Sequence, residues 1–274
     1  MENPIFKKTI APKKKFGQNF LISPAVAEKI VNAAELESTD TVLEIGPGKG
    51  VLTSLMTDRC RKIWAVEIDP RLVETLSAMF GQSEKIKIVN QDILQYDFDE
   101  IIKESGRSFK VVANLPYNIT VPILEKLIES RQHIASIIVM VQKEMADRLS
   151  AKPSSKDYGS LSVFIQYHLK VEKLFNVLPD SFFPKPKITS SVIKLTPHKT
   201  PPVAIDGEAD FFDFVRLCFS QRRKMLRSVL KQHNNWEEEI SNRISTEMDL
   251  TRRAETLNLN EFVKLYNILK ADQR

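Results

Sequence analysis

An asparagine, a proline and an aromatic ring stand together in Asn114-Leu115-Pro116-Tyr117, directly after the apolar run 111–113. The Asn114 side-chain oxygen and the Leu115 carbonyl can both accept hydrogen bonds from one planar NH2 group. Pro116 fixes its own φ at about −65° and favours an extended Leu115, which aims that carbonyl. The Tyr117 ring could stack on a heterocycle that carries the amine. The tetrapeptide therefore suggests a site for a heteroaromatic amine, although a turn that merely ends a strand is the common alternative.

A second unusual feature is a glycine-rich turn, residues 44–50, with the sequence EIGPGKG. Gly46, Gly48 and Gly50 permit a left-handed backbone and let a ligand lie against the main chain. Their spacing is G-x-G-x-G, whereas dinucleotide sites need G-x-G-x-x-G. Glu44 would repel a pyrophosphate but attract the sulfonium and ammonium of S-adenosylmethionine, directly or through an adjoining group. We therefore favour a methyl donor over a dinucleotide or a purely structural turn.

Two carboxylates at the ends of neighbouring apolar runs could complete an adenosine site. Glu67 follows the run 63–66 and could accept hydrogen bonds from both ribose hydroxyls. Asp92 follows the run 86–89 and could accept a hydrogen bond from an adenine amino group. Ligands of open parallel sheets bind beyond the carboxyl ends of the strands, so one edge of a sheet would hold all these groups.

The elements needed to build such a sheet are visible in the hydrophobic pattern. Short apolar runs alternate with helical stretches, which predicts βαβ units and a doubly wound α/β domain. Two later apolar runs could close the sheet. The predicted strands are 41–45, 63–66, 86–89, 111–113, 137–141, 171–177 and 192–195, and the predicted helices among them are 51–59, 70–80, 119–130 and 161–169.

The pattern changes near residue 200. The proline-containing stretch 197–207 is typical of a linker, and the chain beyond it is helical. We predict two domains, residues 1–200 and residues 201–274, the second small and entirely helical. Its predicted helices are 211–232, 236–247 and 259–270.

Composition excludes several classes of protein. The 274 residues are 42% hydrophobic and 27% charged, as in globular proteins with an ample core. No apolar run approaches the roughly 18 residues of a membrane span, and residues 1–15 lack the apolar segment of a secretory signal. The two cysteines are far apart and the four histidines have no metal-ligand spacing. We therefore expect a cytoplasmic protein without a metal, and no element suggests more than a monomer.

Positive charge is clustered in two places, which favours an anionic partner such as nucleic acid. The net charge is +5. If 216–231 is one helix, Arg216, Arg223, Arg227 and Lys231 share a face suited to phosphates. Phe214, Leu217, Met225 and Val229 would then pack on the core, and the alternative is a merely solvated face. The two clusters are Lys7, Lys8, Lys13, Lys14 and Lys15, and Arg222, Arg223, Lys224, Arg227 and Lys231.

Taken in order, these blocks resemble the KsgA family of ribosomal RNA adenine dimethyltransferases. The similarity runs through nearly the whole chain, and the order of the blocks is more specific than any one of them. They are residues 14–21, 44–50, 66–69, 91–92, 114–118, 142–144, 158–162, 182–187 and 221–224.

The resemblance implies a Rossmann-like class I methyltransferase sheet, with one antiparallel strand near its end, and a small helical C-terminal domain. It implies S-adenosylmethionine-dependent methylation of N6 of two adjacent adenosines, in the hairpin loop near the 3′ end of small-subunit (16S) ribosomal RNA. The partner would be the small ribosomal subunit. By this similarity the donor contacts would be Asn19, Leu21, Gly46, Glu67, Asp92 and Asn114.

The resemblance also implies a second stacking ring opposite Tyr117. Phe182 aligns with the stacking aromatic of the family. Phe183 stands where the family often has a small polar residue, so either ring could face the pocket.

Other functions remain possible from the sequence. The related large-subunit methyltransferase that confers macrolide resistance is a close rival, but Leu115 and the blocks 158–162 and 221–224 favour the small-subunit enzyme. A non-catalytic assembly factor on the same fold is a second alternative, and the intact Asn114–Tyr117 argues against it. A dinucleotide oxidoreductase is the third.

Overall fold

The computed structural model describes residues 11–13, 16–106, 108–232 and 238–271. Its contacts divide the chain into two units. The first consists of residues 1–146 and 171–197, and the second of residues 147–170 and 198–274. A single boundary near residue 200 does not describe this division, because the stretch 147–170 belongs with the C-terminal helices. The reason is packing, since Val163 and Tyr167 share a buried cluster with Phe211 and Phe212.

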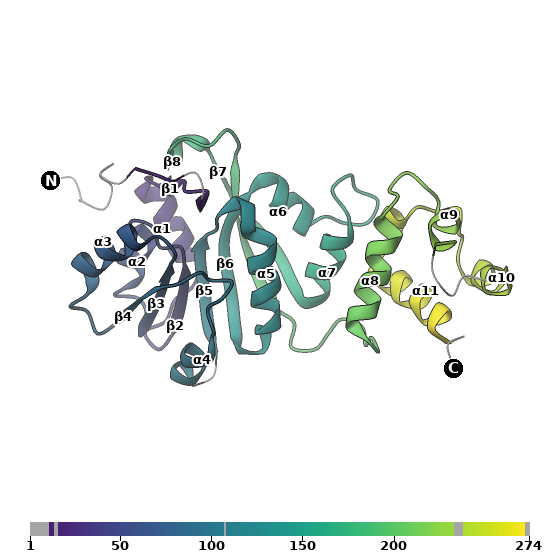
Figure 1. Ribbon diagram of the computed structural model, residues 1–274, viewed down its shortest axis with the longest axis horizontal. Helices are drawn as coiled ribbons and strands as arrows, with labels where there is room; N and C mark the ends of the chain where they lie inside the picture. The colour runs from purple at the N-terminus through teal and green to yellow at the C-terminus, as the bar shows by residue number, and fades with distance from the viewer. Residues whose placement is uncertain (1–10, 14–15, 107, 233–237, 272–274) are drawn as a thin grey trace. The chain divides into compact units, whose positions relative to one another are not determined.

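A seven-stranded sheet forms the centre of the first unit, in the order β4-β3-β2-β5-β6-β9-β7 (Figure 1). Strands β2 to β6 are parallel, and β9 runs antiparallel to β6. This arrangement confirms the predicted Rossmann-like class with an antiparallel strand near its end. The bounds are β2 Thr41–Ile45, β3 Lys62–Glu67, β4 Ile86–Asn90, β5 Phe109–Asn114, β6 Ile134–Gln142, β7 Leu169–Val177 and β9 Ser190–Pro197.

Local sequence signals start the helices that follow the strands. The Ser23 side chain caps α1 by accepting a hydrogen bond from Val26 N, and Asp69 caps α3 by accepting from Arg71 N. Each cap precedes a proline, whose fixed φ suits the first helical position. Helices α1 and α2 bury apolar side chains against the sheet. The bounds are α1 Pro24–Ala33, α2 Val51–Met56, α3 Pro70–Phe80, α4 Asp99–Ser105 and α5 Thr120–Glu129.

The order of the strands reverses between β2 and β5. The chain leaves β2 for β3 and β4 on one side, then returns to β5 on the other. Such a reversal opens a crevice at the carboxyl ends of the two central strands. Ile45 pairs with Ala113 in this register. Gly46 and Asn114, the next residues on the two strands, therefore meet at the crevice.

A second, two-stranded sheet joins segments far apart in the sequence. Strand β1 (Phe20–Leu21) pairs antiparallel with β8 (Phe182–Phe183). In this register Phe20 lies opposite Phe183, and Leu21 lies opposite Phe182. The segment before α1 is thus fastened to the predicted stacking aromatics.

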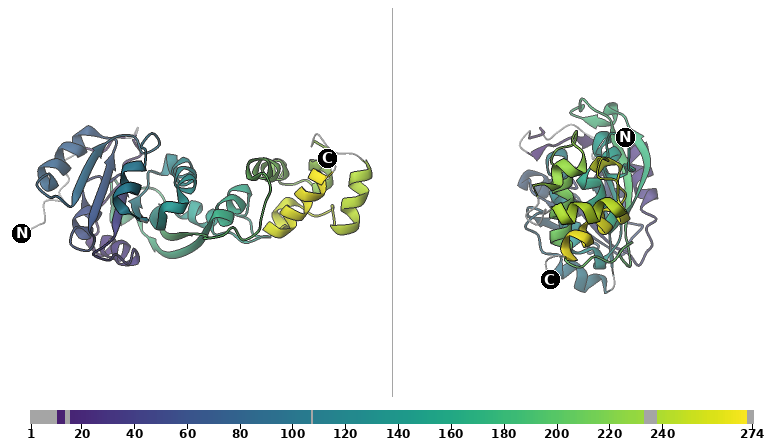
Figure 2. Two further views of the ribbon diagram at one scale, coloured as in Figure 1. Left: turned by 90° about the horizontal axis from the view of Figure 1, so that it is seen from below. Right: turned by 90° about the vertical axis from the view of Figure 1, so that its right-hand side faces the viewer.

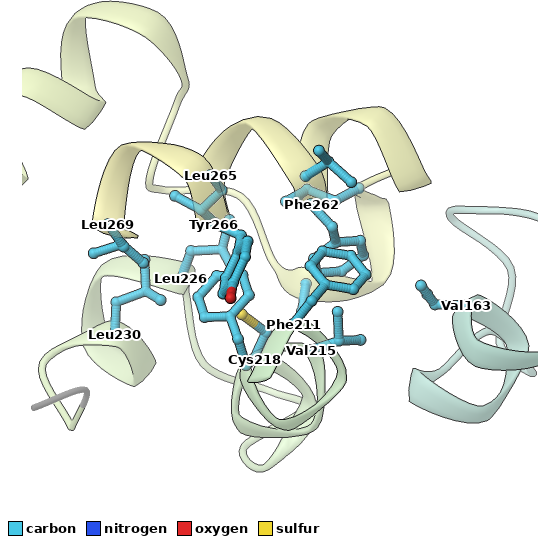
Figure 3. Close-up of a cluster of buried hydrophobic side chains, with 14 of the residues drawn as sticks. Val163, Phe211, Val215, Cys218, Leu226, Leu230, Phe262, Leu265, Tyr266 and Leu269 are labelled. Atoms are coloured by element: carbon cyan, nitrogen blue, oxygen red, sulfur yellow. The ribbon is translucent and has the colours of Figure 1, made fainter. Parts of the chain in front are cut away.

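The second unit is built mainly from helices, and those after residue 198 are drawn in green and yellow in Figures 1 and 2. Figure 3 shows Phe211 and Val215 of α8, Leu226 of α9 and Tyr266 of α11 meeting in its core. None of the helices in the described part of the chain has the length and apolarity to cross a bilayer. Helix α6 (Lys143–Leu149) begins in the first unit and ends in the second. The other bounds are α7 Ser160–His168, α8 Glu208–Phe219, α9 Leu226–Leu230, α10 Glu238–Glu247 and α11 Leu259–Ala271.

The predicted continuous helix 211–232 is wrong. Helix α8 ends at Phe219, and α9 begins only at Leu226. The Leu226 backbone N–H donates to the Arg252 carbonyl at 2.8 Å instead of to the preceding turn of a helix. Met225 is extended, with ψ 151°, and is 52% exposed instead of packing on the core. The predicted stripe of cations along one helix therefore does not exist.

Candidate active site

A pocket opens at the crevice between β2 and β5. It encloses about 960 Å³, part of it open to solvent. The predicted site residues in its wall are Asn19, Leu21, Glu44, Gly46, Gly48, Glu67, Asp92, Asn114, Leu115, Pro116 and Tyr117.

The glycine-rich turn leaves room for a ligand at one glycine and for packing at another. Gly46, Gly48 and Gly50 have φ of +63°, +60° and +76°, values that L side chains rarely adopt. A Cβ on Gly46 would meet nothing within 4 Å, so its backbone borders open space. A Cβ on Gly50 would lie 2.7 Å from the Phe80 ring. Gly46 therefore suits close approach by a ligand, and Gly50 suits the packing of α3.

Glu44 lies almost completely out of contact with solvent. Its side chain accepts a hydrogen bond from the Thr53 hydroxyl at 2.6 Å, and the residue is 1% exposed. Burial raises the pKa of Glu44 to about 8. The carboxyl therefore keeps its proton near neutral pH in this state, and a cationic ligand would have to displace that proton to gain a full ion pair.

Glu67 ties the glycine-rich turn to the end of β3. Its two oxygens accept hydrogen bonds from Gly48 N at 3.1 Å and from Asp69 N at 2.9 Å. Burial raises the pKa of Glu67. Because each carboxylate oxygen has two lone pairs, both can still accept a hydroxyl from a ligand. The backbone bonds thus fix the orientation of the carboxylate.

Asp92 is half-buried and lines the same pocket. Its Oδ1 accepts a hydrogen bond from Leu94 N at 2.9 Å. Its second oxygen has no protein partner among the described residues and can accept a hydrogen bond from a ligand in the pocket.

The Asn114-Leu115-Pro116 backbone has the geometry expected from the sequence. Pro116 has φ −61° and ψ 126°. The Leu115 N–H donates to the Met140 carbonyl at 3.1 Å, and the Leu115 side chain is buried. The Asn114 Nδ2 donates to the Asn19 carbonyl at 3.0 Å. This bond uses the donor end of the amide, so that the Asn114 Oδ1 is left as an acceptor.

Tyr117 is half-buried, and its hydroxyl is 2.7 Å from the Ser190 Oγ. Burial raises the pKa of Tyr117, so the phenol stays neutral. The Ser190 contact lies at the start of β9 and holds the ring in one position beside the Asn114 amide.

The two phenylalanines of β8 have different environments. Phe182 is 3% exposed and packs in the core cluster with α1 and α2, and it does not line the pocket. Phe183 is half-buried, because successive residues of a strand point to opposite faces, and it does not line the pocket either. This burial counts against the prediction that Phe182 stacks on a base, since the ring would first have to leave the core.

Sequence reasoning missed a cluster that fastens the N-terminal segment to the pocket. The Asp69 side chain is fully buried and accepts hydrogen bonds from Arg71 Nη2 at 2.6 Å and Gln18 Nε2 at 3.1 Å. The Arg71 hydrogen bonds hold the pKa of Asp69 well below its usual range. Gln18 lies in a block already noted in the sequence, but nothing there pairs it with Asp69. Lys14 and Lys15 of that block lie outside the described residues.

Comparison with known proteins shows which family the chain belongs to. A family model described as ribosomal RNA adenine dimethylase matches residues 10–270. The chain belongs to this family. It is a ribosomal RNA adenine dimethyltransferase, as the block resemblance predicts.

Similar proteins agree with this assignment. The ribosomal RNA small subunit methyltransferase A of Geobacillus sp. (strain WCH70) is 44% identical over 94% of this chain and 91% of its own. That of Bacillus mycoides (strain KBAB4) is 43% identical with the same coverage. Among solved structures, a dimethyladenosine transferase from Plasmodium falciparum has a TM-score of 0.80 and 26% identity, covering 93% of this chain and 98% of that one. The 23S rRNA methyltransferase ErmE has a TM-score of 0.70 and 25% identity, covering 92% and 100%.

The predicted RNA-binding residues of this dimethyltransferase lie in its second unit, and they differ in availability. Arg222 donates to the Lys156 carbonyl and to the Glu255 carboxylate, the latter at 3.2 Å. Arg222 therefore stabilises the fold of the second unit through contacts within it. The side chains of Arg223, Lys224 and Arg227 are exposed, and they have no partner among the described residues. In the same described ranges no cluster of three or more His, Cys, Asp or Glu could hold a metal ion.

Proposed function

We propose that this dimethyltransferase methylates N6 of two adjacent adenosines in the 3′-terminal hairpin loop of small-subunit (16S) rRNA, using S-adenosylmethionine, during small-subunit biogenesis in the cytoplasm. The main support is the free Asn114 Oδ1 at the edge of a pocket lined by Gly46, Glu67 and Asp92. The small-subunit substrate is favoured because the relatives named for it are 43–44% identical, whereas ErmE is 25% identical.

The pocket fits the proposed donor. Open space at Gly46 admits a ligand against the backbone, and carboxylate oxygens of Glu67 and Asp92 remain as acceptors for a ribose and an adenine amino group. Asn19 and Leu21 close the pocket from the N-terminal segment. S-adenosylmethionine, when bound, supplies a methyl group activated by its sulfonium sulfur.

On the acceptor side, the adenine amine is a poor nucleophile because its lone pair is delocalised into the ring. The Asn114 Oδ1 and the Leu115 carbonyl would accept its two N–H groups and favour a pyramidal nitrogen. The same dipoles would stabilise positive charge that develops on the nitrogen. No base is needed before transfer, because the proton can leave the nitrogen afterwards.

The target base must leave its stack to reach this site. Stacking on Tyr117 would offset that cost by roughly 1–3 kcal/mol. Phe183 is the less buried ring of β8 and the better candidate for the second stacking ring, and Phe182 could serve only after leaving the core. Phosphate contacts from Arg223, Lys224 and Arg227 would hold the RNA, with Arg222 shaping the turn that carries them. We expect the enzyme to act as a monomer.

The test is incubation with radiolabelled S-adenosylmethionine and small subunits that lack the modification, followed by digestion of the RNA. We expect dimethyladenosine in 16S rRNA, and we expect Asn114→Ala to abolish most turnover while donor affinity stays within about tenfold. Label only in large-subunit RNA would instead support the resistance enzyme. Tight subunit binding without any label would support the assembly factor.

A further inference from the structure

We propose that Gln18, held by the buried Asp69, is a positioning residue that sets the orientation of the Asn114 amide through the Asn19 carbonyl. The inference rests on the proposed role of Asn114 as an acceptor for the target amine. It assigns the segment 18–21 a part in catalysis besides closing the donor pocket.

An asparagine amide can be placed in two orientations, and only one suits the proposed reaction. With Nδ2 donating to the Asn19 carbonyl at 3.0 Å, the Asn114 Oδ1 is free to accept from the target amine. The reverse orientation would set Oδ1 against the Asn19 carbonyl oxygen, which cannot donate. It would also present an NH2 to the NH2 of adenine. The Asn19 carbonyl therefore selects the productive amide.

The Asn19 carbonyl is itself held from both sides along the chain. On one side, Gln18 Nε2 donates to Asp69 Oδ2 at 3.1 Å, and Gln18 Oε1 accepts from Lys13 N at 2.7 Å. On the other side, Phe20 and Leu21 form β1, which pairs with β8. Asn19 lies between these two anchors, so losing either one frees its carbonyl to move.

Asp69 is a rigid anchor for Gln18. Its side chain is fully buried, and Arg71 donates to it through Nε at 3.1 Å and Nη2 at 2.6 Å. Its side chain also caps α3, and its backbone N–H donates to Glu67 at the end of β3 at 2.9 Å. The hydrogen bond from Gln18 to Asp69 therefore holds the N-terminal segment in a fixed position relative to β3 and α3.

Gly17 gives independent evidence that this segment fits closely against the Asn114–Tyr117 loop. Its φ is +62°, and a Cβ placed there would lie 2.9 Å from the Asn118 Oδ1. The chain before Asn19 therefore lies close to the Asn118 side chain and to Pro116, whose Cβ would be 3.9 Å from a Cβ on Gly17. Such contact is expected if the segment positions the loop.

The experiment uses a donor–acceptor swap. Gln18→Glu places a carboxylate beside Asp69 and breaks the bond by repulsion. The double variant Gln18→Glu with Asp69→Asn restores it with reversed polarity, because the amide introduced at position 69 can donate to the carboxylate introduced at position 18. The swap gives up the bond from Arg71 Nη2, which donates to the same Asp69 oxygen as Gln18. We expect Gln18→Glu to lower the single-turnover rate at saturating donor and RNA by about 10- to 100-fold, with donor affinity changed less than about threefold. The double variant should recover part of the rate lost in Gln18→Glu, and Asp69→Asn alone measures the cost of the lost Arg71 bond.

A matched control makes the same substitution at Gln132, which is exposed before β6, at the opposite edge of the sheet. Gln132→Glu should leave the rate unchanged. Gln18→Met removes the hydrogen bond without adding charge and should lower the rate like Gln18→Glu. Thermal unfolding of each variant shows whether a lower rate results from misfolding. If Gln18→Glu is destabilised, recovery of the rate in the double variant still tests the Gln18–Asp69 bond.

A double-mutant cycle separates this inference from the proposed function. If Gln18 acts through Asn114, Gln18→Glu should change the residual rate of Asn114→Ala by less than about twofold. The positioning role of Gln18 is overturned if Gln18→Glu leaves the rate unchanged, or if it lowers the rate equally in the wild type and in Asn114→Ala. In either case the proposed acceptor role of Asn114 still stands. Full turnover by Asn114→Ala overturns the acceptor role of Asn114 and this inference with it.

Discussion

Among single residues, Glu44 has the most unusual environment in the pocket wall. It is buried, bonded to the Thr53 hydroxyl, and has a pKa of about 8 against an ordinary value of 4.5. Between these two values the unfolded chain loses the proton and the folded protein keeps it. The free energy of unfolding therefore falls as pH rises through this window. The burial of Glu44 in the pocket wall thus lowers the free energy of unfolding in this window, and a cationic ligand beside the carboxylate could reduce that loss.

Glu44→Gln should remove this pH dependence, because the amide can still accept from Thr53 but cannot ionise. We expect the variant to gain stability over the wild type as pH rises from about 5 to about 8, by at most about 1.4 kcal/mol per pH unit. Urea unfolding without ligand at several pH values measures the difference. Parallel stability curves for the two proteins would show that Glu44 ionises normally when buried.

The Tyr117 ring and its hydroxyl can be tested separately. Tyr117→Phe and Ser190→Ala both remove the 2.7 Å contact but keep the ring. We expect each to lower kcat/KM for RNA by less than about fivefold. Tyr117→Ala removes the stacking surface, worth roughly 1–3 kcal/mol, and should lower kcat/KM by about 10- to 100-fold. Equal losses in all three variants would mean that the hydroxyl, and not the ring, carries the function.

At the scale of elements, the turn between α8 and α9 separates two kinds of arginine. Arg222 bonds the turn to the Tyr158 carbonyl at 3.4 Å and to Glu255, whereas Arg223 points to solvent without a partner among the described residues. The two are neighbours in one basic block. Only the fold distinguishes the one that stabilises the turn from the one that is free to bind.

Arg222→Ala should lower the stability of the helical unit by about 1 kcal/mol, because two carbonyls lose a donor and the partly exposed ion pair adds little. Arg223→Ala should leave stability within about 0.5 kcal/mol of the wild type. Urea unfolding followed by circular dichroism makes the comparison. Similar stability of both variants would count against an internal role for Arg222.

At the scale of the whole molecule, the proposed RNA contacts Arg223 and Arg227 both lie in the second unit. Arg223→Glu combined with Arg227→Glu should weaken binding to 16S rRNA and flatten its dependence on salt, since fewer counterions are released. Filter binding over a salt series measures both effects. Arg216→Glu is the matched control, because Arg216 already pairs with Asp213 on α8. An unchanged salt dependence of binding would mean that Arg223 and Arg227 do not contact RNA phosphates and that the turn is only a solvated surface.

Much of the first unit followed from local sequence. The strand 41–45 and the helix 70–80 are confirmed at their predicted bounds, because an apolar run and an Asp-Pro start act on their own segments. The order of strands and helices predicted which residues stand at one sheet edge. The pocket wall contains Glu44, Glu67, Asp92 and Asn114 for that reason.

The sequence by itself determined which chemical groups this enzyme carries and at which strand ends they stand. Only the tertiary structure decided which partners they have. A carbonyl 95 residues away orients the Asn114 amide, residues 250–252 start α9 at Leu226, and pairing with β1 leaves Phe182 in the core. Each of these depends on a contact between distant segments. Local propensity and periodicity describe one segment at a time, so they carry no information about such contacts.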